Sequence, residues 1–107
     1  MSIEQLTALE LKQKIDRNEP LTLLDVREPF EFNYAHINGS LLIPLNQLPE
    51  RLAELDGDKK IVVICHHGMR SLQAANFLVN SGFQKVANLQ GGVDAWSQDC
   101  DSAVRRY

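Results

Sequence analysis

The run Ile61-Val62-Val63-Ile64-Cys65-His66-His67-Gly68-Met69-Arg70-Ser71 carries the strongest structural signal in the chain. Its first four residues are all β-branched and predict a strand over 61–64. The strand pattern stops abruptly at Cys65. Apolar residues at helical spacing then predict a helix that begins near Ser71 and ends by 80–82. A strand followed by a short loop and a helix is half of a βαβ unit.

The segments on either side repeat this alternation of strand and helix patterns. Apolar runs predict further strands over 21–26, 41–43 and 85–89. A capping box at Thr7-Ala8-Leu9-Glu10 predicts the start of a first helix. Other helical patterns cover 28–34, 45–55 and a short terminal helix with Val93 and Trp96. Such alternation predicts an α/β fold with a central parallel sheet.

Length and charge exclude several classes of protein. A chain of 107 residues fits a single domain spanning 1–107. Eleven basic and fourteen acidic residues give a net charge of −3, which disfavours nucleic acid as a partner. No apolar run is long enough to cross a membrane, and residues 1–5 do not resemble a signal peptide. We therefore expect a cytoplasmic protein with no membrane partner and with reduced thiols.

Cys65 is the candidate nucleophile. It lies at the carboxyl end of a predicted strand, where ligands bind in open parallel sheets. The loop after it leads into a helix N-terminus, whose unpaired amides and dipole favour an anion. Arg70 adds positive charge, and Gly68 lets the backbone turn. All these features favour a reactive thiolate. A free cysteine is often only a small buried hydrophobe, but packing does not require Gly, Arg and Ser behind it.

Four motifs in order resemble the single-domain rhodanese family, from about Leu6 to Trp96. They are Leu24-Asp25-Val26-Arg27-Glu28; Ala35-His36-Ile37-Asn38-Gly39-Ser40 with Ile43-Pro44; Cys65 to Ser71; and Gly82-Phe83 with Val86, Leu89-Gln90-Gly91-Gly92 and Trp96. The resemblance implies a rhodanese-like fold, in which helices cover both faces of a central parallel sheet.

The resemblance also implies a sulfurtransferase that carries sulfur as a Cys65 persulfide. The substrate-binding loop would be His66, His67, Gly68, Met69, Arg70 and Ser71, with no cofactor. The partners would be a small-molecule sulfur donor and acceptor, or a protein with a persulfide or thiol. Two-domain thiosulfate enzymes carry basic residues after the cysteine and near the first motif, where this chain has His66, His67 and Glu31. Thiosulfate should therefore be attracted less strongly, and a persulfide is an alternative donor.

Two other functions remain open at this point. The first is a sulfur-carrier module with little free turnover. The second, less favoured, is a cysteine-dependent phosphatase or arsenate reductase, whose loop has the spacing Cys-x5-Arg. Here four residues separate Cys65 from Arg70, which favours a smaller bound group.

Other reactive or charged side chains receive structural interpretations. Consecutive Cys65, His66 and His67 seldom converge on one ion, so no metal site is expected. Cys100 lies between two aspartates, which should raise its pKa and make it a poor nucleophile. Arg27 is interpreted as a scaffold residue that pairs with Glu28 or Glu31.

Overall fold

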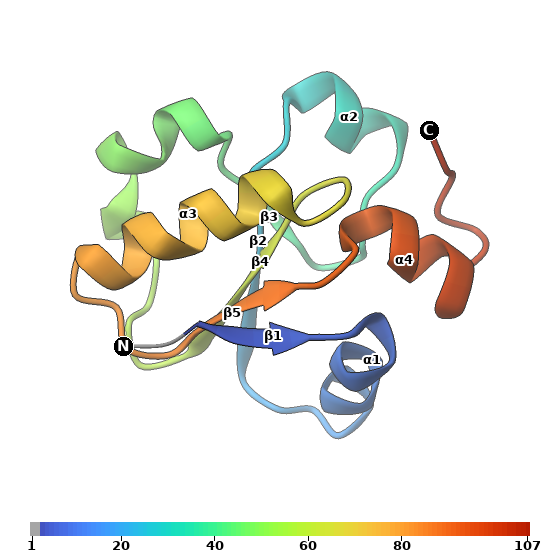
Figure 1. Cartoon of the computed structure of the whole chain (residues 1–107), viewed down its shortest axis with the longest axis horizontal. Helices are drawn as coiled ribbons and strands as arrows, with labels where there is room; N and C mark the ends of the chain where they lie inside the picture. Colours follow the sequence, from blue (N-terminus) through green and yellow to red (C-terminus); the bar gives the residue numbers. More distant parts are fainter. Residues whose placement is uncertain (1–2) are drawn as a thin grey trace.

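The computed structural model describes residues 3–107 and contains a five-stranded, all-parallel sheet (Figure 1). The strands lie in the order β1-β5-β4-β2-β3. Their bounds are β1 Glu4–Leu6, β2 Leu21–Asp25, β3 Leu41–Leu42, β4 Lys60–Ile64 and β5 Val86–Leu89. The predicted α/β class with a parallel sheet is confirmed.

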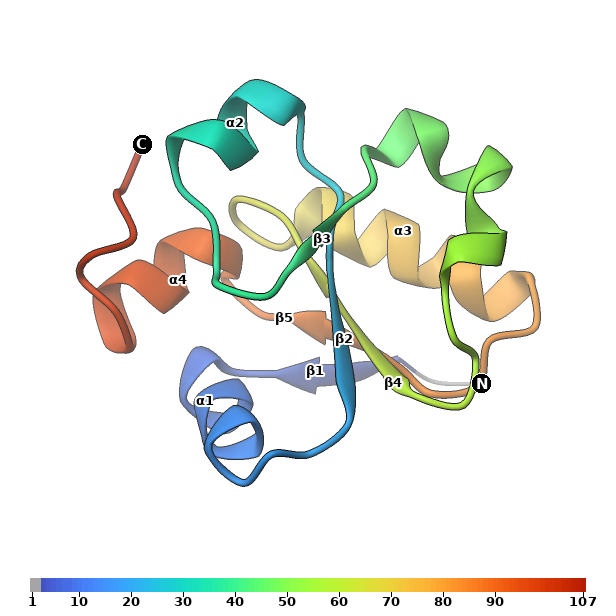
Figure 2. The same ribbon diagram turned by 180° about the vertical axis from the view of Figure 1, so that it is seen from behind.

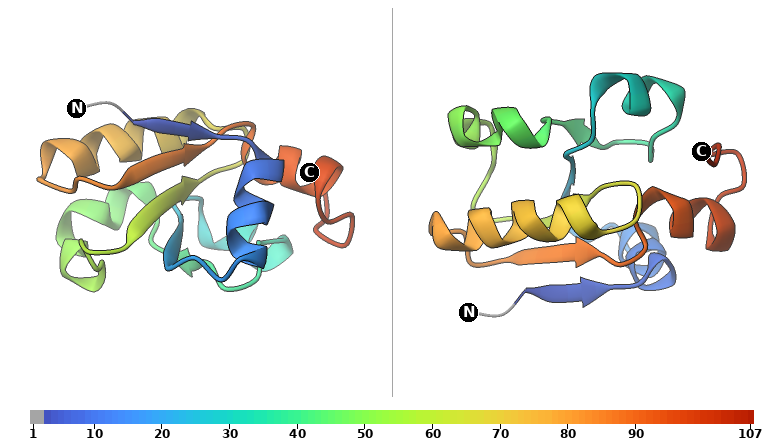
Figure 3. Two further views of the ribbon diagram at one scale, coloured as in Figure 1. Left: turned by 90° about the horizontal axis from the view of Figure 1, so that it is seen from below. Right: turned by 45° about the horizontal axis from the view of Figure 1, so that its top comes forward.

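Helices cover both faces of the sheet. They are α1 Ala8–Asp16, α2 Pro29–Tyr34, α3 Met69–Asn80 and α4 Gly92–Asp99, with two 3₁₀ helices, η1 Leu45–Glu50 and η2 Leu52–Glu54. α3 runs along β5 (Figure 3), and η1 lies beside α3 (Figure 2). No helix of residues 3–107 is long and apolar enough to cross a membrane.

The central strand β4 separates two hydrophobic clusters because its side chains alternate between the faces. Val62 and Ile64 pack in one cluster with residues of α1 and α4. Ile61 and Val63 pack in the other cluster with residues of α3 and η1, and Cys65 belongs to this second cluster. The sheet is therefore covered on both sides, which explains the near-continuous apolar character of its central strands.

Local sequence patterns predicted some helix boundaries correctly and others incorrectly. The capping box forms as predicted, since the Thr7 amide donates to Glu10 at 2.9 Å and the Glu10 amide donates to the Thr7 hydroxyl at 3.1 Å. α3 begins at Met69 rather than near Ser71. The pattern over 45–55 forms two 3₁₀ helices instead of one helix, with Pro49 inside the first and a break at Arg51.

Candidate active site

Cys65 immediately follows the last residue of β4, as predicted, and its side chain is buried. Its Sγ accepts a hydrogen bond from the Gly68 amide at 3.0 Å. The Ser71 hydroxyl lies 3.2 Å from the same sulfur. Gly68 caps α3 with a left-handed φ of 107°, a conformation that suits glycine. The loop therefore surrounds the sulfur with polar groups that can stabilise negative charge.

A chain of polar side chains extends from the sulfur through the buried Ser71 and Asn88 to the exposed Gln5. The Ser71 hydroxyl donates to the side-chain oxygen of Asn88, which lies in β5. The Asn88 amide nitrogen donates in turn to the Gln5 side chain at 3.0 Å and to the Gly68 carbonyl at 3.4 Å. Ser71 and Asn88 are 0% and 3% exposed, so each needs these partners. Asn88 and Gln5 were not among the sequence-predicted site residues.

The amino end of α4 holds the backbone of the loop in place. The Val93 amide donates to the Cys65 carbonyl at 2.8 Å, and the Asp94 amide donates to the His66 carbonyl at 3.1 Å. Gly92 allows this approach, because a Cβ on it would overlap both carbonyl oxygens. The Gly91-Gly92 turn therefore joins the last helix to the Cys65 loop.

Arg70 does not point its charge freely into the loop. Its two terminal nitrogens donate to the two Glu31 carboxylate oxygens at 2.7 and 2.9 Å. Glu31, from α2, is only 7% exposed. Its hydrogen bonds from Arg70 lower the pKa of Glu31 to about 2. The pair is therefore ionised at neutral pH, and each charge neutralises the other.

Tyr107 closes the other side of Glu31 and is a site residue that the sequence did not single out. Its hydroxyl donates to Glu31 at 2.8 Å and accepts from Arg27 at 2.7 Å. Burial raises the pKa of Tyr107 to about 12, so the hydroxyl keeps its proton. The C-terminal segment thus lies beside α2 and α4 (Figure 1).

The expected pairing of Arg27 with Glu28 or Glu31 is wrong. The fully buried Arg27 guanidinium makes its ion pair with Asp25, at 2.7 Å. It also donates to the Ala35 carbonyl at 2.7 Å. Asp25 ends β2 and Arg27 follows two residues later, so the bidentate pair closes over a short turn. The Glu31 carboxylate instead accepts from Arg70, Tyr107 and the Glu28 amide.

The two loop histidines stack on one another, and His66 also stacks on Tyr107 of the C-terminal segment. The His66 ring lies 3.9 Å from the His67 ring and 3.8 Å from the Tyr107 ring, centroid to centroid. Burial and the neighbouring His67 lower the pKa of His66, which disfavours its charged form. His67 and Met69 are exposed at the surface of the loop.

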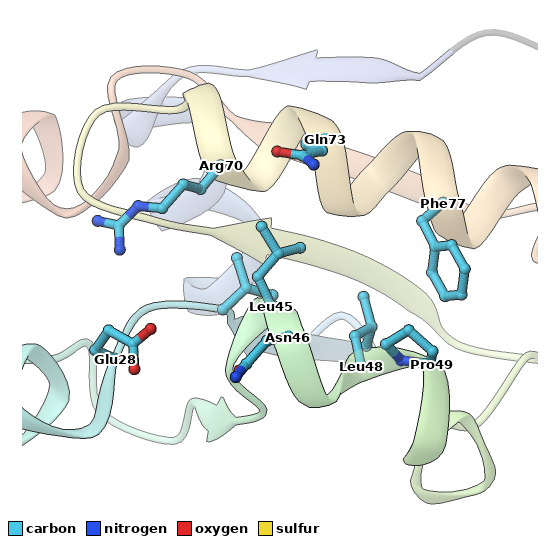
Figure 4. Close-up of a pocket in the computed structure, with 9 residues that line it drawn as sticks. Glu28, Leu45, Asn46, Leu48, Pro49, Arg70, Gln73 and Phe77 are labelled. Carbon is cyan, nitrogen blue, oxygen red and sulfur yellow. The ribbon is translucent and has the colours of Figure 1, made fainter.

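A groove of about 470 Å³ begins at Arg70 and runs along α3 (Figure 4). Apolar side chains from η1 and α3 line most of it. Glu28 and Arg70 lie at one end, and Phe77 lies at the other (Figure 4). The remaining lining residues are Val26, Leu45, Asn46, Leu48, Pro49 and Gln73.

Cys100 lies far along the chain from this loop, just after α4, and is half-buried. Burial raises the pKa of its thiol, and the neighbouring Asp99 and Asp101 raise it further. The direction agrees with the prediction, although burial is the larger cause.

Residues 7–99 match the family described as the rhodanese-like domain. This chain belongs to the rhodanese family. It is 39% identical over 88 residues to the thiosulfate sulfurtransferase GlpE of Stutzerimonas stutzeri, covering 82% of this chain and 81% of GlpE. It is 42% identical over 96 residues to a candidate sulfur carrier, YrkF of Bacillus subtilis, covering 90% of this chain. This chain spans only 52% of YrkF, about half of the length of that protein.

Solved structures confirm the rhodanese fold. The crystal structure of a rhodanese-like domain protein from Staphylococcus aureus superposes with a TM-score of 0.85. The two chains are 27% identical, and the match covers 98% of this chain and 99% of the other. The predicted family and fold are therefore both confirmed for this rhodanese domain.

Proposed function

We propose that this rhodanese is a sulfurtransferase that carries sulfane sulfur as a persulfide on Cys65. The observation that carries the proposal is the environment of Sγ, which accepts from the Gly68 amide and lies 3.2 Å from the Ser71 hydroxyl. Both groups can donate to a sulfur anion. The first-turn amides of α3 have no acceptor within the helix and are available to an outer sulfur.

The proposed reaction has two steps, sulfur uptake by Cys65 and sulfur transfer to an acceptor. The Cys65 thiolate attacks the sulfane sulfur of a donor, such as thiosulfate or an organic persulfide. The donor's bond to that sulfur breaks, and sulfite or a thiolate leaves with the electron pair. A nucleophilic acceptor, such as cyanide or a thiolate, then attacks the outer sulfur and restores the Cys65 thiolate. This is covalent catalysis in which Cys65 is both nucleophile and leaving group.

A sulfur-carrier role is the second candidate, and the similarity to YrkF favours it. A carrier would form the same Cys65 persulfide but would pass its sulfur to a partner protein with a persulfide or thiol. Small acceptors such as cyanide would then react only slowly with the Cys65 persulfide. We propose a small-molecule donor and acceptor first, and a partner protein as the alternative.

Phosphatase or arsenate reductase chemistry receives no support from the site. Such enzymes hold a tetrahedral oxyanion with a free arginine at Cys-x5-Arg. The guanidinium of Arg70 is instead occupied by both carboxylate oxygens of Glu31. The residue at the Cys-x5 position is Ser71, which is buried and bonded to Asn88.

The test is thiocyanate formation from cyanide, measured with thiosulfate and with an organic persulfide as donors. Cys65→Ser should abolish turnover with both donors. Cys100→Ser is the matched control and should retain nearly full activity, because its thiol lies outside the loop. Turnover retained by Cys65→Ser would overturn the proposal. A persulfide that forms on Cys65 without turnover would assign the chain to the carrier class.

A further inference from the structure

We propose that Glu31 is a specificity-determining residue of this rhodanese: by neutralising Arg70, it makes the Cys65 loop prefer sulfane sulfur donors with one negative charge over dianionic donors. The inference rests on the proposed sulfur transfer and extends it to the class of donor. Thiol persulfides and thiosulfonates carry one charge, whereas thiosulfate carries two.

The geometry of the ion pair holds Arg70 against Glu31. Arg70 is the arginine of the nucleophile loop, and both of its terminal nitrogens bond to Glu31, at 2.7 and 2.9 Å. Two further hydrogen bonds hold the carboxylate in this position. The Tyr107 hydroxyl donates to one oxygen at 2.8 Å, and the Glu28 amide donates to the other at 3.0 Å. A carboxylate with four hydrogen bonds does not release Arg70 easily.

Charged groups around the Cys65 loop are also neutralised by pairing. Two other arginines near the loop also form ion pairs, since Arg27 pairs with Asp25 at 2.7 Å and Arg106 pairs with Asp94 at 2.9 Å. Burial lowers the pKa of His66 and so disfavours its charged form. These groups around the loop therefore add almost no net positive charge. A dianion loses more hydration than a monoanion when it enters such a site and gains little attraction in return.

Two donors of similar chemistry and different charge can test this preference. With thiosulfate, the Cys65 thiolate takes the outer sulfur and sulfite leaves. With benzenethiosulfonate, the thiolate takes the outer sulfur and benzenesulfinate leaves. In both reactions one S–S bond forms and one S–S bond breaks, with no external oxidant or reductant. The donors differ in charge at the reacting group, so the ratio of their kcat/KM values reports how the site responds to charge.

The experiment compares Glu31→Gln with the parent and with Glu54→Gln. Glutamine keeps an oxygen acceptor for Arg70 but removes the charge. Glu54, which lies in η2, is the matched control. It makes a similar ion pair with Arg51 at 2.6 Å and lies outside the Cys65 loop. In Glu31→Gln, the thiosulfate-to-benzenethiosulfonate ratio should rise about three- to tenfold, as expected from one extra uncompensated charge. Glu54→Gln should leave the ratio unchanged.

Salt dependence gives a second measurement that also uses the parent protein. In the parent, the thiosulfate-to-benzenethiosulfonate ratio of kcat/KM values should change less than about twofold as the salt concentration rises. In Glu31→Gln the same ratio should fall clearly, because salt screens exposed charges. An unchanged ratio in folded Glu31→Gln would overturn the inference while leaving sulfur transfer intact. A steep salt dependence of the parent ratio would also overturn it. Failure of the parent with both donors would instead overturn the proposed function.

Discussion

Ser71 connects the reacting sulfur to the buried interior of the sheet. Its hydroxyl lies 3.2 Å from Sγ of Cys65 and donates to Asn88. When Cys65 carries a negative charge, the hydroxyl can turn and donate to the sulfur instead. A hydrogen bond to a charged group contributes about 1.5–3 kcal/mol.

Ser71→Ala should therefore slow persulfide formation about tenfold or more, since 1.36 kcal/mol corresponds to a factor of ten. The measurement is the single-turnover rate of sulfur uptake from a donor in excess. Ser81→Ala is the control, because Ser81 lies just beyond the other end of α3 and its hydroxyl donates to the local Phe77 carbonyl, away from the Cys65 sulfur. Equal rates for Ser71→Ala and the parent would mean that the hydroxyl does not stabilise the sulfur anion.

The place of Cys65 at a strand end could be predicted from the sequence, but the distant residues packed around it could not. Cys65, Gly68 and Ser71 lie in one short segment, where a strand end and a helix start mark a candidate site. Asn88 meets Gln5, a residue 83 positions away, and Tyr107 meets Glu31, which is 76 positions away. Only the folded topology brings such residues together, because nothing in their local sequence marks them.

At the scale of elements, the contact between α4 and the nucleophile loop depends on Gly92. Its φ is +60°, and a Cβ there would lie 2.5 Å from the His66 carbonyl oxygen and closer still to that of Cys65. The amides of Val93 and Asp94 could not then reach these carbonyls without a shift of the loop. The Cys65 sulfur would move with its backbone.

Gly92→Ala should lower kcat/KM at least about tenfold, because small displacements of reacting groups carry large rate penalties. It should also destabilise the protein by about 2–4 kcal/mol through overpacking and strain. Thermal unfolding and sulfur transfer would both be measured. Gly39→Ala is the control, with φ +83° but no atom within 4 Å of the added Cβ. It should lose some stability and keep its activity; an equal loss of activity in both variants would rule out the clash as the cause.

Element prediction was most accurate where a strong local pattern agreed with the tertiary structure. β4 and the capping box of α1 are examples. β1 was missed because it has only three residues, of which two are exposed, so no alternation of apolar residues marks it. The 45–55 segment has leucines at helical spacing, but Pro49 and the break at Arg51 limit it to 3₁₀ turns.

At the scale of the whole molecule, the Glu31 carboxylate links α2 to α3 and to the C-terminal segment. The pKa of Glu31 falls from 4.5 to about 2 on folding. A lowered pKa contributes stability that is fully present above about pH 4.5 and is lost as the pH falls toward 2. Part of the acid sensitivity of the fold should therefore come from this one group.

Glu31→Gln should accordingly show a shallower loss of unfolding free energy between pH 4.5 and 2 than the parent. Urea unfolding at several pH values would measure it. Glu50→Gln, which changes an exposed carboxylate of η1, should follow the parent curve. If the unfolding free energies of Glu31→Gln and the parent fell in parallel with decreasing pH, the Glu31 carboxylate would not be a source of the acid sensitivity of the fold.

The most direct test of the Cys65 persulfide is the mass of the protein after incubation with a sulfane sulfur donor. The parent and Cys100→Ser should each gain one sulfur atom, about 32 Da, and lose it again on addition of cyanide, as a reversible thiol modification does. Peptide mapping should place the added sulfur on Cys65, and Cys65→Ser should gain none. The proposed role of Cys65 would be contradicted if the parent gained no mass with thiosulfate or with an organic persulfide, or if the adduct mapped to Cys100.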